Sequence, residues 1–466
     1  MTMKENLFSE FEDVSAKQWK QKIQFDLKGA DYNERLVWNS LDGINVKPFY
    51  HQDESPEPVH LSTPLRWNIT EQIYVTASGK ANKKAHEALR KGAESIWFIL
   101  PTEEMDLKEL FTGLPLSEVP VYIRPEFISE EFFLRLDEQV GQGSKVYLQF
   151  DIVGNLARSG NWFKDQTEDH KVLDILLQKC QNLKSFISID AGLYQNAGAN
   201  IPQQLAYTMA HVNEYFNHTA PNTEVSKNVK FQFLVSVGPN YFFEIAKLRA
   251  LRLLFSTLSH EFGLDGECYI LAQPTRRNKT LYDYNVNLLR TTTECMSAVL
   301  GGANSVCNMA YDAIYHRNNS FGSRIARNQL LVLKHESYFE KVANPAEGSY
   351  YVETLTHDMA SKALDIFKDI EKGGGFVTQL KEGIIQKKIS ESAAKEQEEF
   401  DEGKLVLVGT NKYPNLQDKM KEELELYPFV KQKPRKTLLQ PVIEKRLSEK
   451  AEQERLKREE STNSEK

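Results

Sequence analysis

Cysteine is scarce in this sequence, and its scarcity argues against two kinds of site. The four cysteines lie far apart in apolar surroundings, which fits neither a disulfide framework nor the spacing of metal ligands. The ten histidines are equally scattered, and no His-Glu-x-x-His or Cys-x-x-Cys motif brings ligands together. We therefore predict no bound metal, and buried free thiols at Cys180, Cys268, Cys295 and Cys307.

Long apolar runs and an excess of positive charge are also missing. The apolar run Ile96–Leu100 is far too short to cross a bilayer. A net charge of -7 and a pI near 5.9 argue against nucleic acid or an anionic membrane as a partner. The N-terminus is acidic and amphipathic, which fits neither a secretory signal nor a transit peptide. We expect a cytoplasmic protein without a membrane or nucleic-acid partner.

What the sequence does contain is a regular alternation between about Trp67 and Arg327. Short apolar runs alternate with helical patterns, which predicts parallel strands and right-handed crossovers. Roughly eight such units in ~250 residues is the size of an α/β fold of the (β/α)8 TIM barrel type. A doubly wound open sheet is the alternative, although no glycine-rich phosphate loop follows the first strand. The predicted strands are Ile69–Tyr74, Ser95–Leu100, Val119–Ile123, Val146–Asp151, Ser185–Ile189, Lys230–Ser236, Glu267–Ala272 and Ser305–Cys307.

The segments on either side of the alternation divide the chain further. Residues 1–60 form an arm with one amphipathic helix around Trp19, which either packs on its own barrel or wraps a partner. The barrel takes residues 61–350, and residues 351–443 form linker helices over Leu355–Glu371 and Phe376–Gln397, followed by a short strand and turn at Lys404–Tyr413. Residues 444–466 are mostly charged without an apolar stripe, which predicts a disordered tail.

Two carboxylates stand where barrel enzymes hold their working groups. Asp151 and Asp190 both follow predicted strands, and paired carboxylates there could act as general acid and base. Alternatively, each caps the helix that follows or binds loop amides. No Gly-x-Ser-x-Gly nucleophile elbow is present. An unrelated barrel enzyme that uses these two residues is therefore one hypothesis.

A second hypothesis comes from a family resemblance that extends from about Trp67 to Pro414. It is carried by FISIDAGLYQNAGA, VSVGPNYFFEIAKLRALRLLF, LLRTTTECMSA, SRIARNQLLVLKHES, NPAEGSYYVETLTHDMA and GTNKYPN. These segments resemble the barrel domain of adenosylcobalamin-dependent methylmalonyl-CoA mutases. The N-terminal stretch LFSEFEDVSAKQWKQKIQFDLKGADY resembles the start of their small, or beta, subunit, so the arm is expected to wrap a partner.

The departures from the family pattern bear on catalysis. The family's Tyr-His pair aligns with Gly192 and Leu193, and its catalytic tyrosine, which follows a Trp-x-Ile motif, aligns with Gln72. Neither Leu193 nor Gln72 has a side chain that can take over the role of the family's histidine or tyrosine at its position. The resemblance therefore implies that this chain has no catalytic residues. An arginine expected ten residues after Gln149 is displaced to Arg158. The candidates for a degenerate substrate pocket are Gln149, Lys230, Gln195 and Gln273.

The strand sequences SIWFIL, VYLQF, FQFLV and CYILA are bulky, where the family's catalytic barrels carry small residues around a pantetheine tunnel. Whichever alternate set faces inward, we expect a filled barrel that has displaced the tunnel.

The resemblance implies a non-catalytic small subunit that supports a catalytic alpha subunit. The complex would interconvert succinyl-CoA and (R)-methylmalonyl-CoA. Adenosylcobalamin would be bound by the partner, because the family's Asp-x-His-x-x-Gly motif does not occur in this sequence. The alternative is an active substrate-binding barrel whose cobalamin domain is on a separate chain.

Overall fold

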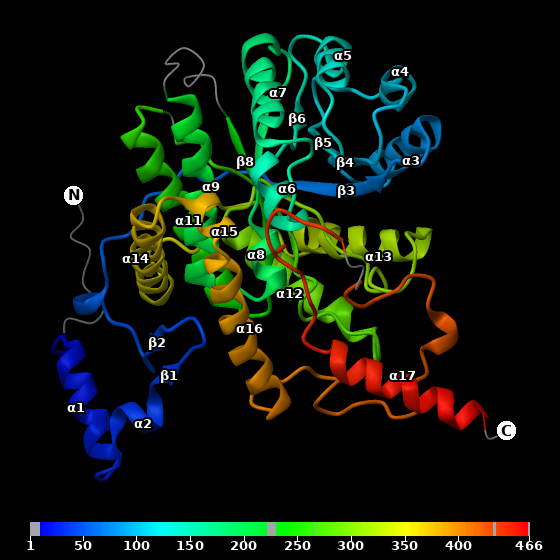
Figure 1. The fold of residues 1–466 in the computed structure, drawn as a ribbon. Helices are drawn as coiled ribbons and strands as arrows, with labels where there is room; N and C mark the ends of the chain where they lie inside the picture. Colours follow the sequence, from blue (N-terminus) through cyan, green and yellow to red (C-terminus); the bar gives the residue numbers. More distant parts are fainter. Residues whose placement is uncertain (1–9, 221–229, 265, 432–434, 465–466) are drawn as a thin grey trace.

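Eight parallel strands form the centre of the molecule (Figure 1). The computed structural model describes residues 10–220, 230–264, 266–431 and 435–464. The strand order is β6-β5-β4-β3-β10-β9-β8-β7, and a parallel bridge between Phe150 and Ile187 joins the two ends. The predicted (β/α)8 barrel is confirmed. The strands are β3 (Asn68–Tyr74), β4 (Ser95–Leu100), β5 (Val121–Pro125), β6 (Val146–Leu148), β7 (Ile187–Asp190), β8 (Phe231–Val237), β9 (Tyr269–Pro274) and β10 (Ser305–Val306).

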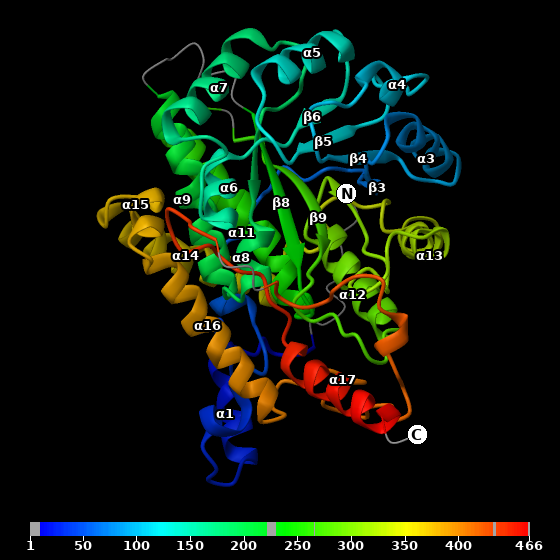
Figure 2. The same ribbon diagram turned by 45° about the vertical axis from the view of Figure 1, so that its right-hand side comes forward.

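The strands form where apolar residues run without interruption. All six residues of β4 are buried, and so are all seven of β8, because a parallel sheet is covered on its outer face by helices and filled on its inner face by side chains. Helices cover the outside of the barrel (Figure 2). They are α3 (Ser78–Arg90), α4 (Leu107–Phe111), α5 (Glu130–Val140), α6 (Ile152–Ser159), α7 (Gln166–Lys179), α8 (Gly192–Ala197), α9 (Ile201–Thr219), α11 (Tyr241–Glu261), α12 (Val286–Leu300) and α13 (Ser320–Leu331).

The N-terminal arm extends away from the barrel (Figure 2). A capping box starts its first helix, in which the Ser15 hydroxyl accepts from the Gln18 amide and the Gln18 side chain accepts from the Ser15 amide. This helix buries only Ala16, while Trp19 and Phe25 are 50% and 79% exposed. Residues 1–9 of the predicted arm lie outside the described residues. The arm contains α1 (Ala16–Asp26), α2 (Tyr32–Leu36) and the antiparallel strands β1 (Trp38–Asn39) and β2 (Asn45–Val46).

The segments after the barrel agree with the predictions in part. The first linker helix is longer than predicted, and the second is two helices divided at Gly383, whose φ of +75° favours glycine. The predicted strand within Lys404–Tyr413 is wrong, because the described structure has only an isolated bridge between Val408 and Lys412 there. The linker helices are α14 (Tyr350–Lys372), α15 (Phe376–Lys381) and α16 (Ile384–Asp401).

The prediction of a disordered tail over residues 444–466 is also wrong. Residues 444–448 pack against the barrel, and helix α17 (Glu449–Ser464) follows them; residues 465–466 lie outside the description. The Arg446 guanidinium pairs with the Glu452 carboxylate at 2.6 Å and donates to the carbonyl oxygen of Lys279 at 2.9 Å. These charges are buried because distant residues pair with them, and a charge pattern read along the sequence does not reveal such partners.

Candidate functional site

Bulky side chains fill the barrel interior. Tyr122 of β5 and Tyr269 of β9 meet hydroxyl to hydroxyl at 2.7 Å, although these strands are not neighbours in the sheet, so the contact crosses the interior. The Tyr122 hydroxyl also contacts the Ser305 hydroxyl at 2.6 Å, and the Tyr147 ring stacks on Tyr269 at 5.0 Å. The prediction of bulky inward residues is confirmed. The apolar members of this cluster are Trp97, Ile99, Leu234, Leu271 and Cys307.

Two glutamines add a polar contact across the interior. The side-chain amide of Gln149, the residue directly after β6, donates to the Gln232 side-chain carbonyl on β8 at 3.0 Å. Gln149 is 5% exposed and Gln232 is fully buried. Gln149, a predicted pocket residue, therefore lies deep in the barrel and is held by a residue of another strand.

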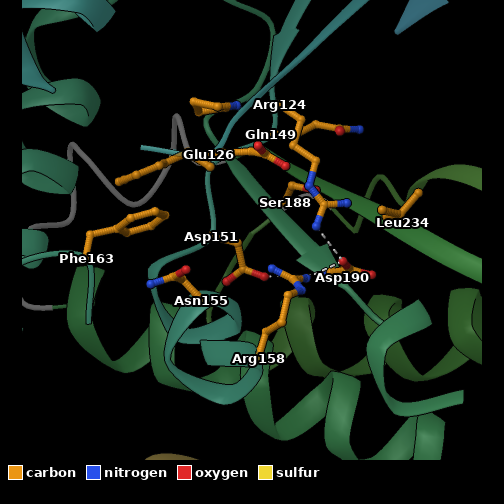
Figure 3. A pocket seen from close by; sticks show the side chains of 12 residues that line it. Arg124, Glu126, Gln149, Asp151, Asn155, Arg158, Phe163, Ser188, Asp190 and Leu234 are labelled. Carbon is orange, nitrogen blue, oxygen red and sulfur yellow. Dashed lines mark hydrogen bonds and ion pairs between the residues drawn. The ribbon is translucent and has the colours of Figure 1, made fainter. Parts of the chain in front are cut away.

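An arginine pocket of about 200 Å³ opens at the carboxyl ends of β5, β6 and β7 (Figure 3). Arg124 at the end of β5 and Arg158 on α6 both point at Asp190, the last residue of β7. The Arg124 guanidinium donates to Asp190 Oδ2 at 3.0 Å, and the Arg158 guanidinium donates to the same oxygen. The pocket is lined by Arg124, Pro125, Glu126, Gln149, Phe150, Asp151, Asn155, Arg158, Phe163, Ser188, Asp190 and Leu234.

The electrostatics of the arginine pocket depend on this shared carboxylate. Burial and the neighbouring charge of Arg158 lower the pKa of Arg124. Burial also acts to lower the pKa of Arg158, but the charges of Asp190, Glu444 and Asp151 outweigh it and raise that pKa. Each guanidinium carries five N–H donors, and among the described residues only Asp190 accepts from either of them. This arrangement can bind a small oxyanion.

Asp151 has a structural role. Its Oδ1 accepts from the Gly154 amide at 2.8 Å as the N-cap of α6, and it contacts His211 Nε2 at 2.9 Å and the Tyr215 hydroxyl at 2.8 Å. Burial acts to raise the pKa of Asp151, but His211, Gly154 and Tyr215 together lower it. His211 is fully buried, and its Nδ1 contacts the Tyr194 hydroxyl at 2.9 Å. A carboxyl group with a lowered pKa is a poor proton donor at neutral pH, so the interpretation as a helix cap holds for Asp151.

The loop with the lost Tyr-His pair is packed into the core. Leu193 lies in α8 and is 1% exposed within the main hydrophobic core. Gln72 lies on the far side of the barrel mouth and lines a separate cavity of about 360 Å³ together with Gln273. The two positions that align with catalytic residues therefore face no common cavity.

The four predicted pocket residues are not brought together. Gln149 lines the arginine pocket and Gln273 lines the cavity of Gln72. Gln195 lines a third cavity of about 600 Å³ and donates to Glu244 Oε1 at 3.0 Å. Lys230 is exposed directly before β8, at the opposite end of the barrel. The described cavities do not bring these four residues together, and a substrate-binding role for any of them stays a prediction.

Sequence reasoning missed Arg124 and His211. Three apolar residues of β5 precede Arg124, and a charged residue at the carboxyl end of a barrel strand is the signal that could have identified it. His211 lies inside α9 among apolar residues, and no spacing signal connects it to Asp151.

Comparison with known proteins decides the family. The family model for methylmalonyl-CoA mutase matches residues 102–463. The chain belongs to the methylmalonyl-CoA mutase family. The family prediction is confirmed, and the hypothesis of an unrelated barrel enzyme built on Asp151 and Asp190 is wrong.

The relatives within the methylmalonyl-CoA mutase family include small subunits. The chain is 31% identical to the methylmalonyl-CoA mutase small subunit of Porphyromonas gingivalis, over 91% of this chain and 73% of that protein. It is 26% identical to the small subunit of Streptomyces virginiae, over 89% of this chain and 73% of that protein. It is 30% identical to the methylmalonyl-CoA mutase of Cereibacter sphaeroides, over 86% of this chain and 64% of that protein. The chain thus spans about two thirds to three quarters of these mutases.

Within the ranges that the structure describes, no three His, Cys, Asp or Glu side chains are grouped so that they could hold a metal ion. No helix in those same ranges is both long and apolar enough to cross a bilayer.

Proposed function

We propose that this chain is the non-catalytic small subunit of a heterodimeric, adenosylcobalamin-dependent methylmalonyl-CoA mutase. Its partner is a catalytic alpha subunit, which interconverts succinyl-CoA and (R)-methylmalonyl-CoA in the cytoplasm. The observation that carries the proposal is the filled barrel, in which Tyr122, Tyr147 and Tyr269 close the axis along which a substrate would have to enter.

The side chains at the aligned catalytic positions support the same conclusion. Leu193 has no proton to donate and is buried in the core, and Gln72 lines a different cavity from the arginine pocket. The loss of one well-placed proton donor costs about 10²–10⁴ in rate, and here two positions are lost. We infer that the loop around α8 is kept for its packing.

Adenosylcobalamin does not fit the arginine pocket. A cavity of about 200 Å³ is far too small for a corrin macrocycle. His211, which lies beneath the pocket, uses both ring nitrogens in contacts with Tyr194 and Asp151, so neither is available to a metal. We propose that the partner subunit binds the cofactor and that this chain contributes no ligand to it.

The arm is the surface that we assign to the partner. Helix α1 leaves Trp19 and Phe25 exposed on an extension that projects from the barrel (Figure 2). Exposed aromatic residues on a projecting element are typical of an interface, since they supply large contact areas. We propose an organisation into the arm (residues 1–60), the barrel (61–350) and linker helices (351–443), with the arm wrapping the alpha subunit.

Co-expression tests this proposal. We expect turnover of methylmalonyl-CoA only when this chain is produced together with an alpha subunit. The Asp190→Ala variant of this chain should leave that turnover unchanged, because Asp190 faces a pocket that takes no part in the reaction. Turnover by this chain with only a separate cobalamin-carrying protein would contradict the proposal.

The second candidate function is an active substrate-binding barrel served by a cobalamin domain on another chain. The arginine pocket favours it, because Arg124 and Arg158 have unused donors at the mouth of the barrel. The same co-expression series distinguishes the two functions, since the second predicts turnover without an alpha subunit and a loss of turnover in Arg158→Gln.

A further inference from the structure

A groove of about 600 Å³ runs between the arm and α16. One wall is the turn of the β1–β2 hairpin and the other is α16, and Figure 1 shows the hairpin beside this helix. The floor is the loop between α8 and α9, residues 198–200, which includes the end of the FISIDAGLYQNAGA segment. The groove is lined by a different set of residues from the arginine pocket, so it is a separate site.

Both walls of the groove are fixed to the barrel. Asp42 in the hairpin turn accepts from the backbone amide of Ile201, the first residue of α9, at 2.7 Å. On the other side, Glu396 of α16 pairs with Arg277 of the loop after β9 at 2.5 Å. A site whose walls are already in place has little to order when a partner binds, so less of the binding energy is lost. The groove is therefore preformed.

Apolar side chains line the groove and remain open to solvent. Trp38, Leu41 and Val406 are 52%, 37% and 47% exposed. Exposed apolar side chains that gather around a cavity mark an interaction site, whereas single scattered ones do not. Small-molecule pockets enclose most of the ligand surface, so walls as exposed as these fit an extended segment of a protein better.

Asp42 is a carboxylate of the groove without a cation. Among the described residues, it accepts only from the Ile201 amide. Burial, which this one hydrogen bond does not offset, raises the pKa of Asp42 to about 6. Lys247 of α11 acts on Asp42 electrostatically, but its ammonium group is held by other partners, which are Glu244, Gln195, Gln204 and Ser236.

The other charged side chains of the groove are paired or of both signs. Glu244 and Glu396 repel a negative charge on Asp42, and they pair with Lys247 and Arg277. Along α16 and the segment after it, the lining contains ammonium groups and carboxylates, which are Lys388, Glu391, Lys395, Glu399 and Lys404. A cation from a partner would therefore find its best position at Asp42.

We propose that this groove binds an extended segment of the alpha subunit in which an arginine or lysine side chain, flanked by apolar residues, pairs with Asp42. The cationic group would supply the charge that Asp42 lacks, while its aliphatic stem and the flanking residues would cover Trp38, Leu41 and Val406. The inference rests on the proposed function, which makes the alpha subunit the partner, whereas the chemistry of the segment follows from the groove itself.

The first test compares variants in their association with a co-expressed alpha subunit. Asp42→Asn keeps an oxygen acceptor for Ile201 and removes the charge. We expect it to weaken association about fivefold at pH 7.5 and less than about twofold at pH 5, where Asp42 is mostly protonated in the parent chain. Sedimentation of the purified complex over a dilution series measures the dissociation constants. Asp365→Asn is the matched control, because it removes the same charge from an exposed position on α14 and should leave association unchanged.

A peptide probe tests the groove in the isolated chain. The probe is a tripeptide amide with arginine between two leucines, and its control carries citrulline, which is neutral and of nearly the same shape, in place of arginine. At pH 7.5, calorimetry should show that the arginine peptide binds about threefold more tightly than the citrulline peptide. Asp42→Asn should abolish this preference, and so should Ser392→Trp, which fills the groove from α16.

The outcomes separate this inference from the proposed function. If the parent chain does not associate with an alpha subunit, the proposed function and the partner named here are both overturned, and the peptide preference then decides the chemistry of the groove by itself. If association occurs and Asp42→Asn leaves it unchanged at pH 7.5, the groove proposal alone is overturned. Equal binding of the two peptides overturns it as well, and so does self-association of the isolated chain that depends on Asp42, which would assign the groove to a second copy.

Discussion

Partly buried carboxylates hold distant parts of this chain together at the scale of single residues. Asp151 caps α6 while it contacts His211 and Tyr215 of α9. Asp42, between the two strands of the arm, accepts from the backbone amide of Ile201 at 2.7 Å, at the start of α9. Both carboxylates face helix N-termini, where the amide groups and the helix dipole favour negative charge. They differ in the number of hydrogen-bond donors around them: Asp151 has several, and Asp42 has one among the described residues.

Asp42 gives a prediction on pH. Burial raises its pKa from 3.8 to about 6, against the effect of the Ile201 hydrogen bond. Because the folded-state pKa is above the unfolded value, the stability that Asp42 contributes is fully present below pH 3.8 and is lost as the pH rises through about 6. Asp42→Asn keeps an oxygen acceptor for Ile201 and removes the charge. We expect it to stabilise the protein by about 1 kcal/mol at pH 8 and by less at pH 5, measured by urea unfolding. An equal effect at the two pH values would contradict the assignment.

Tyr122 gives a second prediction at this scale. Its buried hydroxyl contacts those of Tyr269 and Ser305, so Tyr122→Phe leaves these groups with fewer partners inside the barrel. We expect a loss of about 1–2 kcal/mol in the free energy of unfolding. The control is Tyr413→Phe, at a position that is 78% exposed, where the same change should have almost no effect. Similar losses in both variants would show that the interior network adds nothing to stability.

At the scale of elements, the sequence predicts those helices and strands that are determined by residues within or next to them. Strand β4 is an uninterrupted apolar run, and helix α5 begins at Ser129, whose hydroxyl accepts from the Phe132 amide. The sequence does not predict the division between α15 and α16 at Gly383. A single glycine inside a helical pattern can be helical or left-handed, and the pattern does not distinguish the two conformations. Helix α17 was missed because its stability comes from partners far away in sequence. The same reason explains the site, where Arg124, Arg158 and Asp190 come from three different units of the barrel.

Helix α17 gives the prediction at this scale. Arg446 precedes it and is buried between Glu452 and backbone carbonyl oxygens, so Arg446→Met leaves the Glu452 carboxylate without its cation. Breaking one side of a buried ion pair costs about 3–5 kcal/mol. We expect the segment from residue 438 through α17 to show faster hydrogen exchange and earlier proteolysis. Lys450→Met, an exposed change at the start of α17, is the control. Unchanged protection in Arg446→Met would mean that the ion pair does not hold the segment.

At the scale of the whole molecule, two features combine. Bulky side chains fill the described barrel interior, and residues 438–447 of the same chain cross the barrel mouth. The arm, by contrast, leaves aromatic side chains exposed at a distance from the barrel. These features support the proposal made above, in which a member of the mutase family has kept the fold, has lost the tunnel and binds a partner through the arm.

The arm gives a prediction for the assembly. Replacing the exposed Trp19 and Phe25 by serine should leave the stability of the isolated chain within about 0.5 kcal/mol, because neither side chain is buried in it. We expect the same double variant to weaken association with a co-expressed alpha subunit by tenfold or more, since aromatic anchors dominate interface energies. Sedimentation or size-exclusion chromatography of the co-expressed pair measures this. Wild-type association would assign the interface to another surface.

The filled barrel, which is the centre of this account, is tested most directly by titrating the isolated chain with succinyl-CoA. Substrates of active enzymes bind with constants of about 1 μM to 1 mM, so an open tunnel should give saturable heat in that range. We predict no saturable binding up to about 1 mM, because Tyr122, Tyr147 and Tyr269 occupy the barrel axis. Saturable binding at micromolar concentration would contradict the account and would favour an active substrate-binding barrel.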